Sequence, residues 1–208
     1  MKLIDQSHEI IFCPDTLGMI ERAGRTCYKS EDKITEDSSE KFVKMLVDRG
    51  HHAMIEFGDI IVRFITNRGV THELVRHRLC SFAQESTRYV KYDGEMEFIR
   101  PVWMRSALNG HIKDYHLQCL ESFDERVFIS AMMDAEARYK SLLDAGWRPE
   151  QAREVLPNAL KTEIVVKANV REWRHIFLLR TSLKAHPQMR GLMAPLQKEL
   201  REKLPVLF

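Results

Sequence analysis

Residues 76 to 89 bring together cationic and hydroxyl side chains. The members of this group are Arg76, His77, Arg78, Arg88, Ser81, Ser86 and Thr87. An arginine fork donates two parallel hydrogen bonds to one anion, so the group predicts a phosphate clamp. The alternative interpretation is a solvated basic helix end, where the helix dipole favours cations.

A metal site is the other chemistry that this region suggests, because His72 and Glu73 precede His77. The HExxH zinc motif needs its histidines on one helix face. His72 and His77 are instead five residues apart, which separates them by roughly 140° around a helix. We therefore expect no metal. At helical spacing Glu73 lies beside Arg76 and His77, where it could orient either cation or simply neutralise it.

The elements that must position these side chains are a mixture of helices and strands. Periodicity and capping residues predict helices over residues 14–25, 40–49, 70–78, 113–145, 149–156, 170–180 and 188–203. Runs of β-branched and aromatic residues predict strands over 2–12, 59–66 and 162–168. Residues 67–69 are expected to form a turn, and residues 81–89 an ordered functional loop. We expect an α+β fold with a single domain over 1–208, in which a mixed or antiparallel sheet is flanked by helices, including one long helix.

Composition limits the classes of function. The 32 basic and 30 acidic side chains nearly cancel, which gives no reason to expect non-specific binding to nucleic acid or acidic membranes. The four cysteines, Cys13, Cys27, Cys80 and Cys119, are widely spaced, as is typical of reduced cytosolic thiols. Charge interrupts the N-terminus before a signal-peptide core could form, and no run approaches membrane-spanning length. We expect a soluble cytoplasmic protein.

The run from Arg76 to Tyr89 resembles the signature of the flavin-dependent thymidylate synthases, an Arg-His-Arg triplet followed by a spaced serine and an arginine–tyrosine pair. Other segments resemble family segments in the same order along the chain. They are residues 23–27, 50–56, 152–157, 169–171, 179–180 and 186–188. The likeness therefore covers most of the sequence.

The resemblance implies a specific reaction. Members of the family methylate deoxyuridine monophosphate (dUMP) at C5, with methylenetetrahydrofolate as carbon donor and NADPH as reductant through bound FAD. No enzyme cysteine is required, so Cys80 is expected to be structural. The resemblance makes Arg180 the catalytic cation, placed to stabilise an enolate-like uracil ring. The alternative for Arg180 is a helix-end arginine paired with a carboxylate.

The resemblance also assigns binding residues. Those assigned to dUMP are Glu73, Arg76, Gln84, Glu85, Ser86, Arg88, Arg153 and Arg180, with Ser86, Arg88 and Arg153 as phosphate ligands. Those assigned to FAD are His51, Ala53, Glu56, Arg76, His77, Arg78, Asn169, Arg171, His175 and His186. No GxGxxG motif is present, so side chains must hold the cofactor. The resemblance further implies a homotetramer with active sites at subunit interfaces, and the long apolar helix after Lys113 is a candidate for part of that interface.

Two departures from the family pattern concern the site. Ala83 and Gln84 stand where many members have asparagine and glutamate, and two extra residues separate Arg180 from His186. A rival hypothesis is a phosphate- or nucleic-acid-binding protein that uses the cluster from Arg76 to Arg88, although the near-zero net charge disfavours it. A third hypothesis is a flavoprotein of the same fold that has lost methyl transfer.

Overall fold

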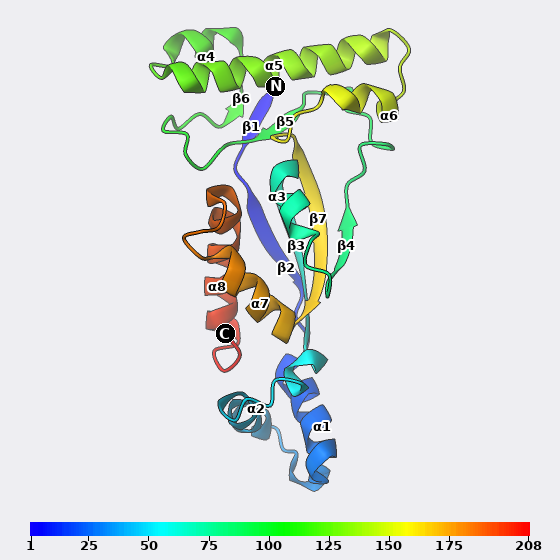
Figure 1. Ribbon diagram of the computed structural model, residues 1–208, viewed down its shortest axis with the longest axis vertical. Coiled ribbons are helices and arrows are strands. Elements are labelled where there is room, and N and C mark those ends of the chain that lie inside the picture. Colours follow the sequence, from blue (N-terminus) through cyan, green and yellow to red (C-terminus); the bar gives the residue numbers. More distant parts are fainter. The chain divides into compact units, whose positions relative to one another are not determined.

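The chain forms helices and two sheets without a regular alternation of helix and strand, which confirms the predicted α+β class (Figure 1). The computed structural model describes residues 1–113 and 115–208 in full. The α-helices are α1 (Thr16–Tyr28), α2 (Ser38–Asp48), α3 (Arg68–Leu74), α4 (Asp114–Cys119), α5 (Phe123–Asp144), α6 (Pro149–Ala152), α7 (Val170–Arg180) and α8 (Pro187–Lys203). The 3-10 helices are η1 (Glu31–Lys33), η2 (Met54–Phe57) and η3 (Arg153–Val155). Among the described residues, no helix combines the length and the apolar composition that a membrane span needs.

The strands form a small mixed sheet and a larger sheet. The strands are β1 (Lys2–Ile4), β2 (Ser7–Phe12), β3 (Asp59–Asn67), β4 (Ser81–Gln84), β5 (Glu97–Ile99), β6 (Gly110–His111) and β7 (Lys161–Asn169). In the sheet β5-β1-β6, β1 pairs in parallel with β5 and antiparallel to β6. The larger sheet has the order β2-β3-β7-β4. Along β3 and β7 buried residues occupy every second position, so one face of each strand covers a core.

The chain divides into two compact units, each made of separate stretches of sequence. Unit 1 comprises Met1–Ser7, Phe64–Leu74 and Ala83–Ile164. Unit 2 comprises His8–Arg63, Val75–Phe82 and Val165–Phe208. Strands β3 and β7 each begin in one unit and end in the other.

The core of unit 1 forms against α5. This helix packs against α4 and α6, and α4 and α5 lie side by side in Figure 1. Helical spacing places Ile129, Met132 and Tyr139 on one face of α5, and these side chains join a buried cluster with Leu3 and Phe98. Leu3 and Phe98 are direct partners in the parallel pairing of β1 with β5. The small sheet and α5 thus share one hydrophobic core.

In unit 2, α1 and α2 pack closely because of a glycine. A Cβ atom at Gly24 would lie only 2.6 Å from the ring of Phe42 on α2. The guanidinium of Arg25 covers the same ring, 4.2 Å from its centroid, and pairs with Glu21 at 2.9 Å. Gly24 therefore permits a close approach of α1 and α2 that a larger residue at this position would prevent.

Helices α7 and α8 pack against each other in the same unit, and Figure 1 shows them side by side. The ring of Trp173 stacks on Phe177 and is fully buried. Its indole Nε1 donates a hydrogen bond of 3.1 Å to the carbonyl oxygen of Ile60 on β3. Trp173 therefore attaches α7 to β3 through both packing and a satisfied polar group.

The structure corrects several element boundaries. The expected strand over 2–12 is divided into β1 and β2, and the expected helix over 113–145 is divided into α4 and α5. Leu120 and Ser122 have extended backbone between these helices, and Arg126 donates to the carbonyl oxygen of Glu121 at 3.0 Å. The expected turn at residues 67–69 is wrong, because α3 begins at Arg68 and the side-chain oxygen of Asn67 accepts a hydrogen bond from the amide of Val70 in its first turn. The expected loop over 81–89 begins with strand β4.

Truncation of Ile129 tests the packing of α5. We expect Ile129→Ala to lower the free energy of unfolding by about 2–5 kcal/mol, because the lost side chain leaves a cavity in a fully buried position. The neighbouring Ser130 is exposed, so Ser130→Ala should change stability by less than about 0.5 kcal/mol. Urea unfolding followed by circular dichroism measures both variants. Equal losses would contradict the described core.

Candidate functional site

The start of α7 organises one half of the candidate site. Strand β7 ends at Asn169, whose side-chain oxygen accepts a hydrogen bond of 2.9 Å from the amide of Glu172. This N-cap fixes the first turn of α7. Because Arg171 and His175 are four residues apart, they lie on one face of the helix, as their spacing predicted, and both line the same cavity.

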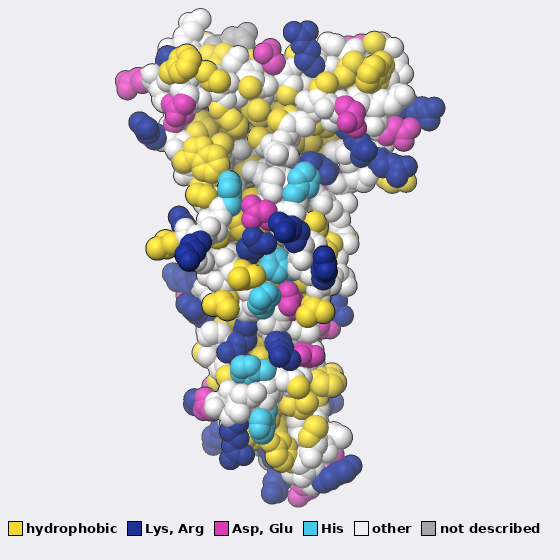
Figure 2. Space-filling model, in the orientation of Figure 1, with side chains coloured by type: hydrophobic (Ala, Val, Ile, Leu, Met, Phe, Trp, Pro, Cys, Tyr) yellow, Lys and Arg dark blue, Asp and Glu magenta, His cyan; other side chains and the backbone are white. Residues whose placement is uncertain are grey.

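Two adjoining cavities of unit 2 collect most of the residues predicted to bind FAD. The first, of about 560 Å³, is lined by Glu56, Leu79, Asn169, Arg171, Glu172 and His175. The second, of about 510 Å³, is lined by Arg76, His77, Arg78, Leu79, Glu172, His175, Leu179 and Arg180. Leu79, Glu172 and His175 belong to both cavities. On the face seen in Figure 2, Lys, Arg and His side chains gather over the region where α7 lies.

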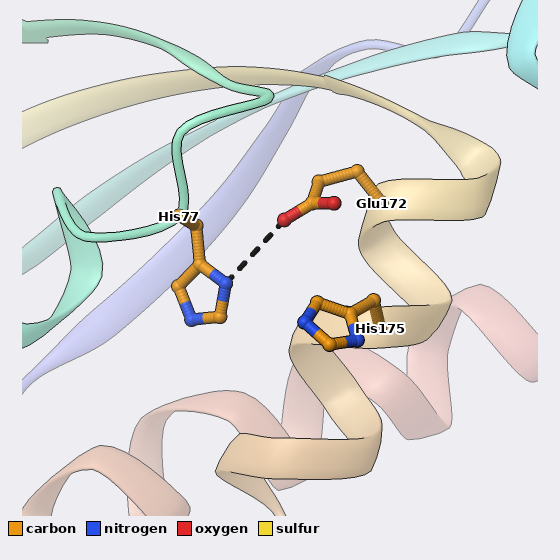
Figure 3. Close-up of side chains that lie close together, drawn as sticks. All are labelled: His77, Glu172 and His175. Atoms are coloured by element: carbon orange, nitrogen blue, oxygen red, sulfur yellow. Dashed lines mark ion pairs between the residues drawn. The ribbon is translucent and has the colours of Figure 1, made fainter.

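His77 forms the closest polar contacts inside this group. The Nε of Arg180 donates a hydrogen bond of 2.9 Å to Nε2 of His77. On the other side of the ring, Nδ1 lies 3.4 Å from Oε1 of Glu172. Figure 3 shows His77 on the loop that follows α3, facing Glu172 and His175 on α7. The rings of His77 and His175 meet edge to face, with centroids 6.0 Å apart.

Both partners of the contact between His77 and Glu172 are shifted towards their neutral forms. Burial, the Arg180 guanidinium and His175 lower the pKa of His77 to about 4. Burial raises the pKa of Glu172, although the charge of His175 opposes that shift. The distance alone suggests an ion pair, but the pKa shifts exclude a charged His77 at neutral pH. We therefore describe His77 as a neutral imidazole with Glu172 beside it.

Three of these side chains have the composition of a metal site. Among the described residues, His77, Glu172 and His175 have ligand atoms that all lie within 4.8 Å of one another. The positive guanidinium of Arg180, however, already donates to His77 and opposes a second cation there. Our expectation that the protein needs no metal remains a prediction.

Other predicted FAD residues lie elsewhere in unit 2. Nδ1 of His51 is 2.9 Å from the hydroxyl of Tyr28, and the two rings are stacked. Ala53 precedes η2, the same short helix that carries Glu56. The carboxylate of Glu56 pairs with Nη1 of Arg171 at 2.6 Å, which attaches η2 to α7. His186 is the N-cap of α8, and its side chain accepts from the amide of Gln188.

Unit 1 contains the residues predicted to hold the nucleotide phosphate. Nη1 of Arg153 donates to the hydroxyl of Thr87 at 3.4 Å, which brings Arg153 to the turn that contains Ser86 and Arg88. The hydroxyl of Ser86 accepts from the amide of Arg88 at 3.3 Å. The guanidinium of Arg88 lies over the ring of Tyr89. The three predicted phosphate ligands therefore belong to one local group.

The neighbouring Gln84 makes internal contacts. Its amide nitrogen donates to the hydroxyls of Thr71, at 2.9 Å, and Thr162, at 3.3 Å, and both threonines are fully buried. These bonds attach β4 to α3 and β7. The predicted nucleotide residue Glu73 lies on α3, close in sequence to Thr71.

Glu85 is held by two neighbours. Its carboxylate accepts from the hydroxyl of Tyr92 and lies 3.5 Å from Nζ of Lys161. Burial and then the contact with Glu85 raise the pKa of Tyr92, which therefore remains a donor at neutral pH.

The sequence analysis did not predict some of these contacts. Glu172 was missed, although its spacing from His175 places both on adjacent turns of α7, and that spacing is readable from the sequence. The contacts of Glu85 with Tyr92 and Lys161 join separate segments and have no local signal. Burial and then the charge of the nearby Glu172 raise the pKa of the Cys80 thiol to about 12, and the expected structural role of Cys80 remains a prediction.

Comparison with known proteins gives a consistent result. The family model described as thymidylate synthase complementing protein matches residues 3–206. Flavin-dependent thymidylate synthases of Corynebacterium efficiens and Corynebacterium aurimucosum are 32% and 35% identical over 199 residues, covering 91% of this chain and 77% and 78% of those proteins. The enzyme of that name from Geobacter sulfurreducens is 31% identical over 202 residues, covering 94% of this chain and 82% of its own length.

A solved structure is similar in fold. It is a UMP/dUMP methylase, PolB, from Streptomyces cacaoi bound with 5-Br dUMP. The TM-score is 0.77 at 24% sequence identity, and the match covers 100% of this chain and 95% of that chain.

The neutral state of His77 predicts a pH dependence of stability. The pKa of His77 falls from 6.5 to about 4 on folding, so the unfolded chain binds more protons than the folded chain between these values. The contribution of His77 to the free energy of unfolding is therefore fully present above this window and is lost as the pH falls through it. Relative to His77→Gln, the wild type should lose on the order of 3 kcal/mol across the window. Urea unfolding at a series of pH values measures the difference, and parallel curves would contradict a buried neutral His77.

Proposed function

This chain belongs to the thymidylate synthase complementing protein family, and from that premise we propose that it is a flavin-dependent thymidylate synthase that methylates C5 of dUMP. In this proposal methylenetetrahydrofolate donates the carbon unit, NADPH is the reductant and FAD is the bound cofactor. The observation that carries the proposal is that Arg180 and the Arg76–Arg78 triplet, distant in sequence, line one cavity.

The side chains around the two cavities of unit 2 suit FAD. Arg76, Arg78 and Arg171 are exposed cations that line these cavities, and guanidinium groups bind a diphosphate well. Leu79 and Leu179 provide apolar surface beside them, as a flat aromatic ring system requires. When bound, FAD would supply the hydride-transfer chemistry that amino-acid side chains lack. The protein would contribute binding, orientation and charge.

Arg180 has the properties that activation of uracil requires. C5 of the base becomes nucleophilic when negative charge develops in the ring, and a fixed cation near N3 and its adjacent carbonyl stabilises that charge. A guanidinium stays protonated at any relevant pH. Arg180 is the last residue of α7, and its Nε is already fixed by His77. Little reorganisation would then be needed when substrate binds.

The turn that contains Ser86 and Arg88 suits the nucleotide phosphate. Arg88 and Arg153 can provide charge-assisted hydrogen bonds to its oxygens. The hydroxyl of Ser86 accepts from the amide of Arg88, so its own proton can be donated to a ligand. We assign Ser86 to substrate binding and not to nucleophilic attack.

The proposed reaction uses no cysteine nucleophile. A thiol attacks as the thiolate. With a pKa raised to about 12, the thiol of Cys80 remains protonated at neutral pH. Cys80 lies beside the Arg-His-Arg triplet in sequence, yet its environment favours a structural role.

We also propose that the chain acts as one domain, 1–208, in a cytoplasmic homotetramer whose active sites include residues from neighbouring subunits. Large exposed apolar side chains support assembly: Leu79 lines both cavities, and Leu183 lies three positions after Arg180 in the sequence. Leu79 is 75% exposed and Leu183 is 88% exposed. Exposed leucines beside a ligand site are typical of surfaces that another subunit covers.

The decisive experiment is to purify the protein and record its absorption spectrum. We expect the spectrum of a bound flavin. We also expect the protein to oxidise NADPH and to form thymidylate, and thymidylate formation should require both dUMP and methylenetetrahydrofolate. A protein that does not bind added FAD would refute the proposal. Flavin binding without thymidylate formation would instead identify a flavoprotein that lacks methyl transfer.

Substitutions separate the roles of the two arginine-containing groups. Arg180→Ala should lower kcat by about 10²–10³-fold, because one charge-stabilising donor is lost, while the folded structure is retained. Ser86→Ala should weaken dUMP binding by about tenfold and change kcat little at saturating dUMP. Arg138 is exposed on α5, and Arg138→Ala is the matched control with unchanged kinetics. Steady-state assays and dUMP titrations provide these values, and loss of chemistry in Ser86→Ala at saturating dUMP would show that its assigned role is wrong.

A further inference from the structure

Arg180 is bound to a histidine through its Nε atom. This N–H donates to Nε2 of His77 at 2.9 Å. An acceptor nitrogen of imidazole must carry its lone pair, so the proton of the neutral ring belongs on Nδ1. Nδ1 faces the carboxylate of Glu172 at 3.4 Å (Figure 3). Hydrogen bonding and the nearby acceptor thus favour the same tautomer.

The groups around His77 keep its ring uncharged. Arg180 and His175 are the charged or titratable neighbours that disfavour a second positive charge, and Glu172 lies opposite them. Arg76 and Arg78 flank His77 in sequence and line the same cavity. Burial first, and then the charges of Arg180 and His175, lower the pKa of His77 to about 4. His77 is therefore available as an acceptor throughout the neutral range.

We propose that His77 is a positioning residue for Arg180, and that Glu172 supports it by keeping the ring proton on Nδ1. The proposal rests on the proposed function, in which Arg180 acts on the uracil ring. A neutral acceptor fixes one edge of the guanidinium without cancelling its positive charge, whereas a carboxylate acceptor would offset that charge. His77 thus has a role beyond contact with FAD. Glu172, which the sequence did not suggest, gains a role through His77.

The first test measures the tautomer directly, without enzyme turnover. Histidine labelled with ¹⁵N gives separate NMR signals for protonated and unprotonated ring nitrogens, and the spectrum of His77→Gln identifies the signals of His77. At neutral pH we expect a proton on Nδ1 and none on Nε2 in the wild type. In Arg180→Ala the preference should weaken and the signals should move towards a mixture of tautomers. A charged ring, or a proton on Nε2 in the wild type, would overturn the proposal.

The second test compares variants at saturating FAD, so that loss of cofactor cannot mimic loss of positioning. The amide oxygen of His77→Gln can accept from Arg180, whereas His77→Phe keeps the ring shape and has no acceptor. We expect His77→Phe to lower kcat at least about tenfold and His77→Gln to stay within about threefold of the wild type. If both variants recover full turnover once FAD is saturating, His77 serves only the cofactor and the proposal is wrong.

Glu172 provides a test that leaves His77 in place. Glu172→Gln retains an acceptor oxygen, and Glu172→Leu removes it. We expect a lower kcat with little change in the KM for dUMP in Glu172→Leu, and near-normal kinetics in Glu172→Gln. Equal kinetics in the two variants would exclude a role through the tautomer.

The NMR spectra and the assay of thymidylate formation together distinguish this proposal from the proposed function. The protein could fail to make thymidylate while the NMR spectra show the expected tautomer in the wild type and a weaker tautomer preference in Arg180→Ala. In that case the contact between His77 and Arg180 is supported and the proposed reaction is wrong. If thymidylate is made while Nε2 carries the proton, the reaction stands and the positioning role fails.

Discussion

The hydrogen bond between Arg180 and His77 is the interaction on which the candidate site depends. It requires a histidine that accepts, and an imidazole accepts only while it is neutral. Burial satisfies this condition, because removal of water disfavours the charged ring more than the neutral one. The same burial raises the pKa of Glu172. Burial therefore favours the neutral forms of both His77 and Glu172, so that their contact does not depend on two full charges.

Burial of this kind needs a rigid framework, which β7 and α7 provide. The strand ends at Asn169, and the helix starts at the next residue without an intervening loop. Trp173 then anchors the helix to β3 through its indole. Since Glu172, His175 and Arg180 all project from this one helix, their mutual spacing follows from helix geometry. His77, in contrast, lies on the loop after α3, which is distant in the sequence from α7.

The sequence predicts the parts of the molecule that depend on local pattern. The α+β class, the bounds of α7 and the shared helix face of Arg171 and His175 all follow from periodicity and spacing. The break between α4 and α5 was missed because apolar residues continue through it, while hydrogen bonds to the backbone at Leu120 and Glu121 replace helical ones. At residues 67–69 both a turn and a helix cap were compatible with asparagine.

Contacts between distant segments could not be predicted from the sequence. His77 and Glu172 are separated by almost half of the chain, and neither residue carries a local signal that it faces the other. The environment of Gln84 is similar in this respect. The family resemblance assigned Gln84 to dUMP, and no local pattern indicated that its amide nitrogen also joins two buried threonines from α3 and β7. Residue type indicates what a side chain can do, and packing decides which of those possibilities is used.

The side-chain oxygen and the side-chain nitrogen of Asn169 have different roles. Its oxygen is occupied by the first turn of α7, so the end left to line the cavity is the amide nitrogen, a pure donor. Aspartate caps a helix about as well as asparagine does. It would, however, present a negative oxygen to the cavity where asparagine presents N–H groups. The helix alone does not explain an amide at this position, whereas the proposed binding of FAD, whose diphosphate is rich in acceptor oxygens, would explain it.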